Sequence, residues 1–196
     1  MSYLIFTIGH STHPIERFTE LLAQHGVTAL ADVRSAPYSR IAPQFRRDAL
    51  AASMQARGIA YVFLGRELGA RRDEAAVYDG DIARYERIAS TEAFARGLQR
   101  VEQGASRFRV ALMCAEKDPI TCHRALLVAR QLSLRGHAIE HIREDGTTES
   151  TASFEERLLA ATGIAAVDLF GSRDDLIADA YRIHGERMAY RRPQEG

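Results

Sequence analysis

The sequence predicts a three-layer α/β/α fold with a central, mainly parallel sheet, and two observations support this prediction. Short apolar segments rich in β-branched residues alternate with longer segments of helical periodicity, an order typical of parallel sheets. Three helix-like segments also end in a glycine followed directly by an apolar run, at Gly26, Gly58 and Gly136. Glycine readily takes the left-handed conformation that ends a helix. A helix that leads into a strand in this way is half of a βαβ unit.

The expected strands are short apolar runs, and the expected helices fill the intervals. Strands are expected at about residues 3–9, 27–33, 59–64, 108–114 and 137–142. Helices are expected at about residues 14–25, 46–57, within 81–104, 121–135, 153–161 and 172–189. In the first helix, Pro14 suits the first turn and Glu16 complements its positive end. The helix over 121–135 is expected to begin at Pro119, with Asp118 as its cap.

Length and composition indicate a single α/β domain over residues 1–196, with a core over 1–146 and a helical extension over 147–196. With 46% hydrophobic and 27% charged residues, the chain is typical of globular proteins that fold without disulfides or metals. The N-terminus lacks the basic stretch and cleavage site of a signal peptide, and no apolar run reaches the roughly 18 residues of a membrane span. We therefore expect a cytoplasmic protein without a membrane partner, whose two cysteines are thiols.

The basic residues are almost all arginine. Lys117 is the one lysine, the other 25 basic residues are arginine, and the net charge is zero. The composition is typical of a GC-rich genome, but the planar guanidinium also suits phosphate and carboxylate groups. Arg34, Arg40, Arg46 and Arg47 have no acidic residue between them, so they form either solvated surface or an anion site. The zero net charge gives no overall attraction to nucleic acid.

The most informative segment runs from Cys114 to Arg124. It holds both cysteines together with Glu116 and His123, follows a strand-like run and precedes an apolar-periodic segment. In an open α/β sheet, ligands bind at the carboxyl ends of the strands. Thiol, imidazole, carboxylate and guanidinium groups concentrated there indicate a reactive or ligand-binding site.

Four interpretations of the cysteines remain open. Cys122 shares an apolar helix face with Ala125 and Leu126, which favours core packing. The same position lies in the first turn of the expected helix, where the dipole favours a thiolate nucleophile, with His123 or His10 as its base. A redox pair is less favoured because the spacing is not Cys-x-x-Cys, and zinc binding is least favoured because the ordinary zinc spacing is absent. Core packing and a functional thiol have equal weight here.

The order Cys122-His123-Arg124 limits what one ligand can contact. Consecutive helical positions point about 100° apart, so at most two of these side chains are expected to reach one ligand. A cation at a helix start is unfavourable without a nearby anion, and Glu116 is the nearest candidate carboxylate. This placement favours a functional role for Arg124.

Polar residues also follow the first two expected strands. The first ends in His10 and Ser11 at a helix N-terminus, a place that binds anions. After the second, Asp32 and Arg34 lie on one side of the strand. They form either an ion pair that closes the sheet edge or a substrate clamp oriented by the carboxylate.

Three further positions complete the candidates. Ser39 and Arg40 lie in the polar loop after the second strand. His141, at the end of the last strand, is expected to be a hydrogen-bonded boundary residue, and Tyr61 a core residue.

Seven motifs with a specific order and spacing lie along the chain. They are Thr7-Ile-Gly-His-Ser11, Asp32-Val-Arg-Ser35 with Pro37 and Ser39-Arg40, Gly58-Ile-x-Tyr61, Leu68-Gly69, Leu112-Met-Cys-Ala-Glu116, Cys122-His-Arg124 and His141-Ile-x-x-Asp-Gly146. Together they resemble a bacterial and archaeal family, the domain of unknown function 488. The resemblance covers about residues 1–146. It implies an α/β protein whose motif residues gather at one edge, and it implies no particular reaction.

We expect these residues to form one site at the carboxyl ends of the strands. The catalytic candidates are His10, Asp32, Glu116, Cys122 and His123. The substrate-binding candidates are Ser11, Arg34, Ser39, Arg40, Cys114 and Arg124. No metal or cofactor is assigned.

The leading expectation is an enzyme that acts on a phosphate-bearing substrate, a nucleotide or a nucleic-acid component. Arginines would hold the phosphate, a histidine would carry the proton, and a cysteine thiolate is a candidate nucleophile. The alternatives are a non-catalytic module that binds a nucleotide or nucleic acid, and a thiol redox or metal-binding protein.

Overall fold

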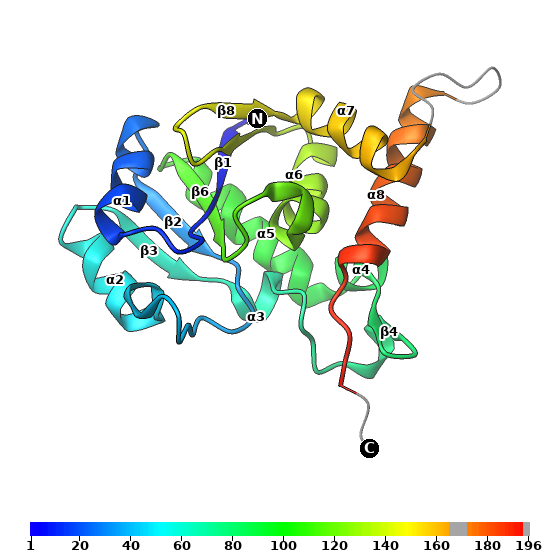
Figure 1. Cartoon of the computed structure of the whole chain (residues 1–196), viewed down its shortest axis with the longest axis horizontal. Coiled ribbons are helices and arrows are strands. Elements are labelled where there is room, and N and C mark those ends of the chain that lie inside the picture. Colours follow the sequence, from blue (N-terminus) through cyan, green and yellow to red (C-terminus); the bar gives the residue numbers. More distant parts are fainter. Residues whose placement is uncertain (165–171, 194–196) are drawn as a thin grey trace.

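The computed structural model describes residues 1–164 and 172–193, and its centre is a six-stranded sheet (Figure 1). The strands are β1 (Leu4–Gly9), β2 (Ala29–Asp32), β3 (Ala60–Phe63), β6 (Val110–Cys114), β7 (Ala138–Ile142) and β8 (Thr148–Ser150). Their order across the sheet is β3-β2-β6-β1-β7-β8. Neighbouring strands pair in parallel except β7 and β8, which are antiparallel. The predicted mainly parallel sheet is therefore confirmed.

The five expected strands are present within a few residues of their predicted bounds. The three glycines at the helix-to-strand junctions have φ values of 62° at Gly26, 70° at Gly58 and 88° at Gly136, in the left-handed region that glycine tolerates. The sequence did not predict β8, because Thr148–Ser150 is a short polar edge strand without an apolar run.

Helices cover both faces of the sheet (Figure 1). On one face of the sheet, α1 (Ile15–Gln24) and α2 (Arg47–Gln55) pack in a core with strand residues such as Phe6 and Met113. The core on the other face contains residues of the long helices α5 (Glu92–Ala105), α7 (Thr151–Thr162) and α8 (Arg173–Met188). Alternation along β6 places Val110, Leu112 and Cys114 in this second core. The three layers of the predicted fold are thereby confirmed.

The chain between β3 and α5 is built from short elements. They are α3 (Gly65–Leu68), β4 (Tyr78–Asp79), β5 (Ile82–Ala83) and α4 (Tyr85–Ala89), with 3₁₀ turns at Ala75–Val77 and, earlier in the chain, Pro43–Phe45. The residues after α8 lie against this region, because the Ala83 amide donates to the Tyr190 carbonyl at 2.9 Å and the Arg192 amide to the Asp81 carbonyl at 2.9 Å. The C-terminal extension therefore returns to the carboxyl edge of the sheet.

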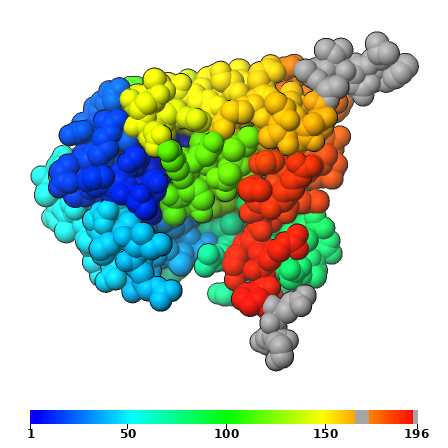
Figure 2. Space-filling view, viewed as in Figure 1, coloured from blue at the N-terminus to red at the C-terminus, as the bar shows by residue number. Residues whose placement is uncertain are grey.

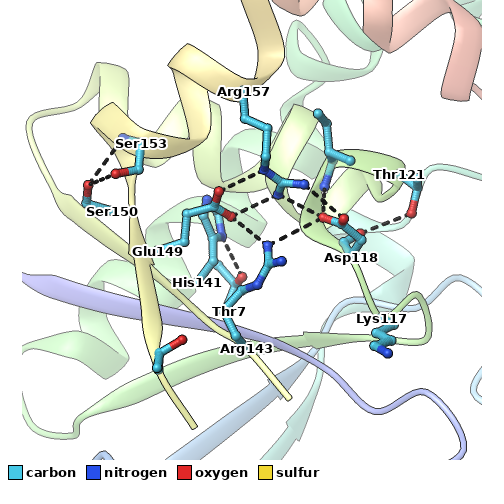
Figure 3. Close-up of polar contacts among 12 residues, drawn as sticks. Thr7, Lys117, Asp118, Thr121, His141, Arg143, Glu149, Ser150, Ser153 and Arg157 are labelled. Carbon is cyan, nitrogen blue, oxygen red and sulfur yellow. Dashed lines mark hydrogen bonds and ion pairs between the residues drawn. The ribbon is translucent and has the colours of Figure 1, made fainter. Parts of the chain in front are cut away.

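An ion-pair network ties the same extension to the segment after β6 (Figure 3). Arg157 of α7 donates to both carboxylate oxygens of Asp118, at 2.9 and 2.8 Å, and to both oxygens of Glu149, at 2.8 and 2.9 Å. Arg143 pairs with Glu149 at 3.0 Å and with Asp118 at 3.7 Å. Because several charges share partners, the network holds its geometry better than an isolated surface pair.

Among the residues that the structure describes, no helix has the length and apolar character needed to cross a membrane.

His141 of β7 is buried beside this network, and its Nδ1 lies 2.8 Å from the Thr7 hydroxyl (Figure 3). Burial, followed by the charges of Arg124, Arg157 and Arg143, lowers the pKa of His141 from 6.5 to about 3. His141 therefore stays neutral in the folded chain at pH values where the unfolded chain binds a proton. The free energy of unfolding should then fall as the pH drops below 6.5.

We predict that His141→Gln flattens this dependence, by up to about 1.4 kcal/mol per pH unit between the two pKa values. Urea denaturation of both proteins at several pH values from neutral to about 4 measures the slopes. Equal slopes for the two proteins would contradict the prediction.

Candidate functional site

The carboxyl ends of β1, β2 and β6 meet at one edge, and the segment after β6 folds over the end of β1. The pairing of β1 and β6 continues past the strands, since the His10 amide donates to the Cys114 carbonyl and the Ser11 amide to the Ala115 carbonyl, both at 2.9 Å. A Cβ atom on Gly9 would lie 1.9 Å from the Glu116 carbonyl oxygen. Only glycine at this position lets the two segments approach so closely.

Asp32 and Arg34 form a buried ion pair at the end of β2. The Arg34 Nε and Nη2 atoms donate to the two Asp32 oxygens at 2.9 and 2.6 Å. The Tyr61 hydroxyl donates to the same carboxylate at 2.8 Å. Tyr61, expected in the core, does pack against it, and its hydroxyl also satisfies this ion pair. The structure shows the ion pair, which is part of both interpretations of the sequence, and Arg34 also lines the cavity described below.

His10 is held neutral by burial and by the neighbouring Arg34 cation. Its Nδ1 lies 2.7 Å from the Ser11 carbonyl, and its Nε2 lies 3.1 Å from Arg34 Nη1. A carbonyl only accepts and a guanidinium only donates, so Nδ1 carries the hydrogen and Nε2 the lone pair. Burial, and then the Arg34 charge, lowers the pKa of His10 to about 4. Both ring nitrogens of His10 are therefore engaged, and the proposal below assigns the proton transfers to another residue.

The expected helix over 121–135 is present over residues 123–134, but its expected start at Pro119 is wrong, because the backbone breaks at Cys122. Asp118 caps a 3₁₀ turn, Pro119–Thr121, and Cys122 then has extended dihedrals of −131° and 133°. A π-helical turn, Arg124–Ala129, and α6 (Arg130–Leu134) follow. Because Cys122 is not helical, the angle of about 100° between consecutive helical positions does not apply to it. The side chains of Cys122 and His123 can therefore lie close together.

This break brings four reactive groups together. One ligand atom each of Cys114, Glu116, Cys122 and His123 lies within 4.8 Å of all the others. Cys114 Sγ is 3.7 Å from His123 Nδ1, and Cys122 Sγ is 3.0 Å from Glu116 Oε2. We call these four residues the thiol cluster. Both cysteines are buried, His123 is half-buried, and Glu116 is exposed.

Neighbouring groups move the pKa values of the two thiols in opposite directions. Burial raises the pKa of Cys114, and its partners Cys122 and Glu116 raise it further. Burial also opposes ionisation of Cys122, but the hydrogen bond from Cys114 and the charges of Arg124 and His123 lower its pKa well below the usual value. Burial lowers the pKa of His123, and Cys122 and Glu116 more than reverse this effect. Cys122 is therefore the thiol that ionises first.

Arg124 is fully buried, and its guanidinium makes no hydrogen bond to a side chain of the thiol cluster. Its guanidinium donates to the carbonyls of Glu116 and Lys117, the second at 3.1 Å, and its Nε lies 3.4 Å from the Thr7 hydroxyl. We expected it to bind substrate directly. The structure instead gives its donors to the main chain, so in the proposal Arg124 positions the segment 114–123.

A cavity of about 230 Å³ opens beside the thiol cluster. Its floor includes Cys114, Glu116 and His123, and its walls include Arg34 and Ser35. The remaining wall comes from distant segments, with Ala70, Arg71, Tyr85, Met188 and Tyr190. Figure 2 shows the surface hollowed between the green segment after β6, the light-blue loop after β2 and the red C-terminal segment.

Sequence reasoning missed Arg71 and Tyr85 as site residues. The exposed Arg71 guanidinium lies 4.9 Å from the centre of the Tyr190 ring, and the Arg71 amide donates to the Ser35 hydroxyl at 2.9 Å. Tyr85 is buried on the cavity wall, and burial, with Cys122, Cys114 and Glu116, raises its pKa. For Arg71, the sequence did offer a signal, because this residue follows the Leu68-Gly69 motif by two positions. Tyr85 lies in a helical segment and carries no signal in the sequence.

Four of the eleven expected site residues line the cavity, namely Arg34, Cys114, Glu116 and His123, and three others lie away from the site. Ser11 has a φ of 48°, the one non-glycine residue in the left-handed region within the described ranges, and it serves the turn that holds His10. The Ser39 hydroxyl accepts from the Ala42 amide at 2.9 Å. Arg40 is exposed in the same loop. The structure brings the other eight candidates to one edge of the sheet.

The chemistry available at the cavity is acid–base and nucleophilic. The thiol cluster offers two sulfurs, an imidazole and a carboxylate, which are also ligands that soft divalent metals prefer. The cavity wall adds an exposed guanidinium and a tyrosine hydroxyl, groups that bind anions.

The part of the chain that contains the thiol cluster matches a known protein family. A model of the family described as Domain of unknown function DUF488 matches residues 14–131. None of the curated proteins compared matches the chain. The matched region includes β2, β6 and the whole thiol cluster, and it excludes His10 and the C-terminal wall of the cavity.

We predict that Asp32→Asn destabilises the fold by about 3–5 kcal/mol, because it leaves the buried Arg34 cation without its counter-ion. Tyr61→Phe removes one hydrogen bond to the same carboxylate and should cost only about 1 kcal/mol. Urea denaturation measures both changes. A loss in Asp32→Asn no greater than that in Tyr61→Phe would contradict the proposed importance of the ion pair.

Proposed function

Since this chain belongs to the family described as Domain of unknown function DUF488, whose description states no reaction, we propose a function from the cavity itself. We propose that the protein is an enzyme that hydrolyses a small phosphate ester. The single observation that carries this proposal is that Cys114, Glu116 and His123 of the thiol cluster line one cavity together with Arg34 and Arg71.

Arg71 is the group best placed to hold the phosphate. Its neighbour in the cavity wall, Arg34, already donates to Asp32 and His10. Arg71 is exposed, and its guanidinium rests on the Tyr190 ring, which leaves its donors directed to solvent or substrate. A guanidinium that binds phosphate in this way forms two parallel hydrogen bonds. Arg34 adds positive charge to the wall without being free to move.

The proton transfers are assigned to Glu116. Hydrolysis needs a bond from a water oxygen to phosphorus, cleavage of the bond to the leaving oxygen, and a proton on that oxygen. Glu116 is exposed on the cavity and can take a proton from the attacking water and return it to the leaving oxygen. Tyr85, whose pKa is raised, stays protonated and donates a hydrogen bond to a phosphoryl oxygen.

The cavity volume favours a small substrate. About 230 Å³ is below the range of about 300–1,000 Å³ typical of pockets for larger ligands. A phosphate group with part of a sugar or a base fits this space. A nucleoside monophosphate would fill it, with its remainder outside the mouth.

We predict that Arg71→Gln lowers kcat/KM for the best phosphate ester by about 10- to 100-fold, because one charge-assisted contact is worth about 1.5–3 kcal/mol. Release of phosphate from aryl phosphates and nucleoside monophosphates is the assay. Arg57→Gln is the matched control, since Arg57 lies at the end of α2 and does not line the cavity.

Two results would overturn the proposal. One is phosphate release that Glu116→Gln leaves unchanged. The other is release of ammonia from a nucleotide without release of phosphate, which would move the reaction to the base.

A second candidate, nucleic-acid binding, is favoured by the loop over residues 36–46. Tyr38 and Ile41 are 62% and 86% exposed. The Arg46 guanidinium lies 4.7 Å from the centre of the Tyr38 ring, and no ion pair of the described residues involves Arg40 or Arg46. Exposed aromatic rings between unpaired arginines are typical of surfaces that bind single strands.

For this second candidate we predict an affinity for a single-stranded oligonucleotide that falls steeply with salt. Tyr38→Ala should weaken binding by about 5- to 100-fold, since one stacked base contributes about 1–3 kcal/mol. Fluorescence anisotropy at several salt concentrations measures both effects. Salt-independent binding, or equal affinity of Tyr38→Ala, would exclude the loop as a nucleic-acid surface.

A further inference from the structure

The thiol cluster has the geometry of a metal site. We propose that Cys114, Cys122 and His123 bind one Zn²⁺ ion, and that Glu116 stands beside its open fourth position. This inference deepens the proposed function and rests on it for the reaction, while the binding of the metal stands on the geometry alone.

The distances fit a tetrahedral ion. With Zn–S near about 2.3 Å and Zn–N near about 2.0 Å, the sulfur and nitrogen ligands of such an ion lie about 3.6 Å apart. The separation of Cys114 Sγ and His123 Nδ1 is 3.7 Å. The four ligand atoms of the thiol cluster lie within 4.8 Å of one another, so one ion can reach three of them with small side-chain movements.

His123 presents the correct nitrogen. Its Nε2 lies 3.0 Å from the Val33 carbonyl, which can only accept, so Nε2 carries the hydrogen. The lone pair is then on Nδ1, which faces Cys114. Metal-binding histidines almost always donate their second N–H to a carbonyl or a carboxylate in this way.

The sulfur of Cys122 also needs a cation or a proton beside it. Cys122 Sγ and Glu116 Oε2 are 3.0 Å apart, and two anions at this separation repel each other. The Arg124 amide points at the same sulfur from the other side, at 3.4 Å. Hydrogen bonds from main-chain amides to sulfur are a common feature of cysteine ligands in metal centres. One Zn²⁺ ion replaces the protons that would otherwise be shared in the cluster.

The other readings of the two cysteines explain less. Both cysteines belong to the apolar core on this face, but core packing alone does not explain the carboxylate and the imidazole that face them. A disulfide would take from His123 Nδ1 the thiol of Cys114 that faces it. Two thiolates and an imidazole form a donor set that selects zinc over calcium or magnesium.

Glu116 differs from the other three residues because it is exposed. Three protein ligands with an open fourth position are the arrangement of catalytic zinc sites. In zinc deaminases, two cysteines and a histidine hold the ion, and a glutamate that is not a ligand carries the proton. In this chain, the ion would lower the pKa of the attacking water, and Glu116 would take a proton from that water as its oxygen bonds to phosphorus. The ester bond breaks with its electron pair on the leaving oxygen, which takes the proton from Glu116.

The test begins with the full chain and the metal alone. After incubation with Zn²⁺ and desalting, we expect one zinc per chain by elemental analysis. Co²⁺ should give the intense absorption of tetrahedral cobalt bound to thiolates. Zinc should also raise the Tm, because the ion binds the folded chain more tightly than the unfolded chain.

The variants assign the ligands. Cys114→Ser, Cys122→Ser and His123→Asn should each lower zinc affinity by at least about 100-fold, while Glu116→Gln keeps one zinc and loses turnover. His13→Gln is the matched control, since His13 lies outside the thiol cluster. Circular dichroism checks that each variant is folded. If a variant does not fold, the cobalt spectrum of the unsubstituted chain still tests the metal site.

The outcomes separate the two proposals. A chain that binds neither Zn²⁺ nor Co²⁺, or that binds zinc equally well without Cys122 or His123, overturns the metal site. Phosphate release by metal-free protein also overturns the catalytic zinc and leaves the phosphate-ester function intact. One tightly bound zinc without turnover of any phosphate ester supports the metal site and overturns the proposed function.

Discussion

The candidate site depends on one buried cation, the guanidinium of Arg124. It is fully buried, and its partners within the described residues are main-chain carbonyls and one hydroxyl. A buried charge is expensive unless many dipoles surround it, and the segment 114–123 supplies these dipoles by wrapping around it. The segment ends in the extended residue Cys122, whose sulfur accepts a hydrogen bond from the Arg124 amide at 3.4 Å. The same charge stands close to the sulfur that ionises first.

Two other features make this wrap possible. Gly9 removes the side chain that would collide with the Glu116 carbonyl, which lets the segment cross the end of β1. On the outer side, Asp118 is fixed by Arg157 and Arg143 (Figure 3). The segment is therefore held from the inside by Arg124 and from the outside by the network on α7 and β7. Rigidity of this kind is what a preorganised reaction centre requires.

Much of the fold could be predicted from the sequence, because its signals are local. Glycines 26, 58 and 136 mark the helix-to-strand junctions by their own conformation. The gathering of His10, Arg34 and Cys114 at one edge follows from the rule that parallel strands end together. The break at Cys122 could not be predicted, because it accompanies contacts of Arg124 with the distant Thr7 and with the Glu116 carbonyl. Local helix preference contains no information about such contacts. Arg71 and Tyr85 were missed for a related reason, since only the tertiary path of residues 65–89 and 189–193 brings them to the cavity.

The mouth and the floor of the cavity come from different parts of the chain. The floor lies inside the region matched by the family model, residues 14–131, while Met188 and Tyr190 lie beyond it. The closing segment is attached to the rest by main-chain hydrogen bonds at Asp81 and Ala83 and by the side chains of Arg191 and Arg192, none of which contacts the floor. Side chains at the mouth can therefore change without disturbing the floor. Evolution, or an engineer, can alter which molecules are admitted while the reaction beneath them stays the same.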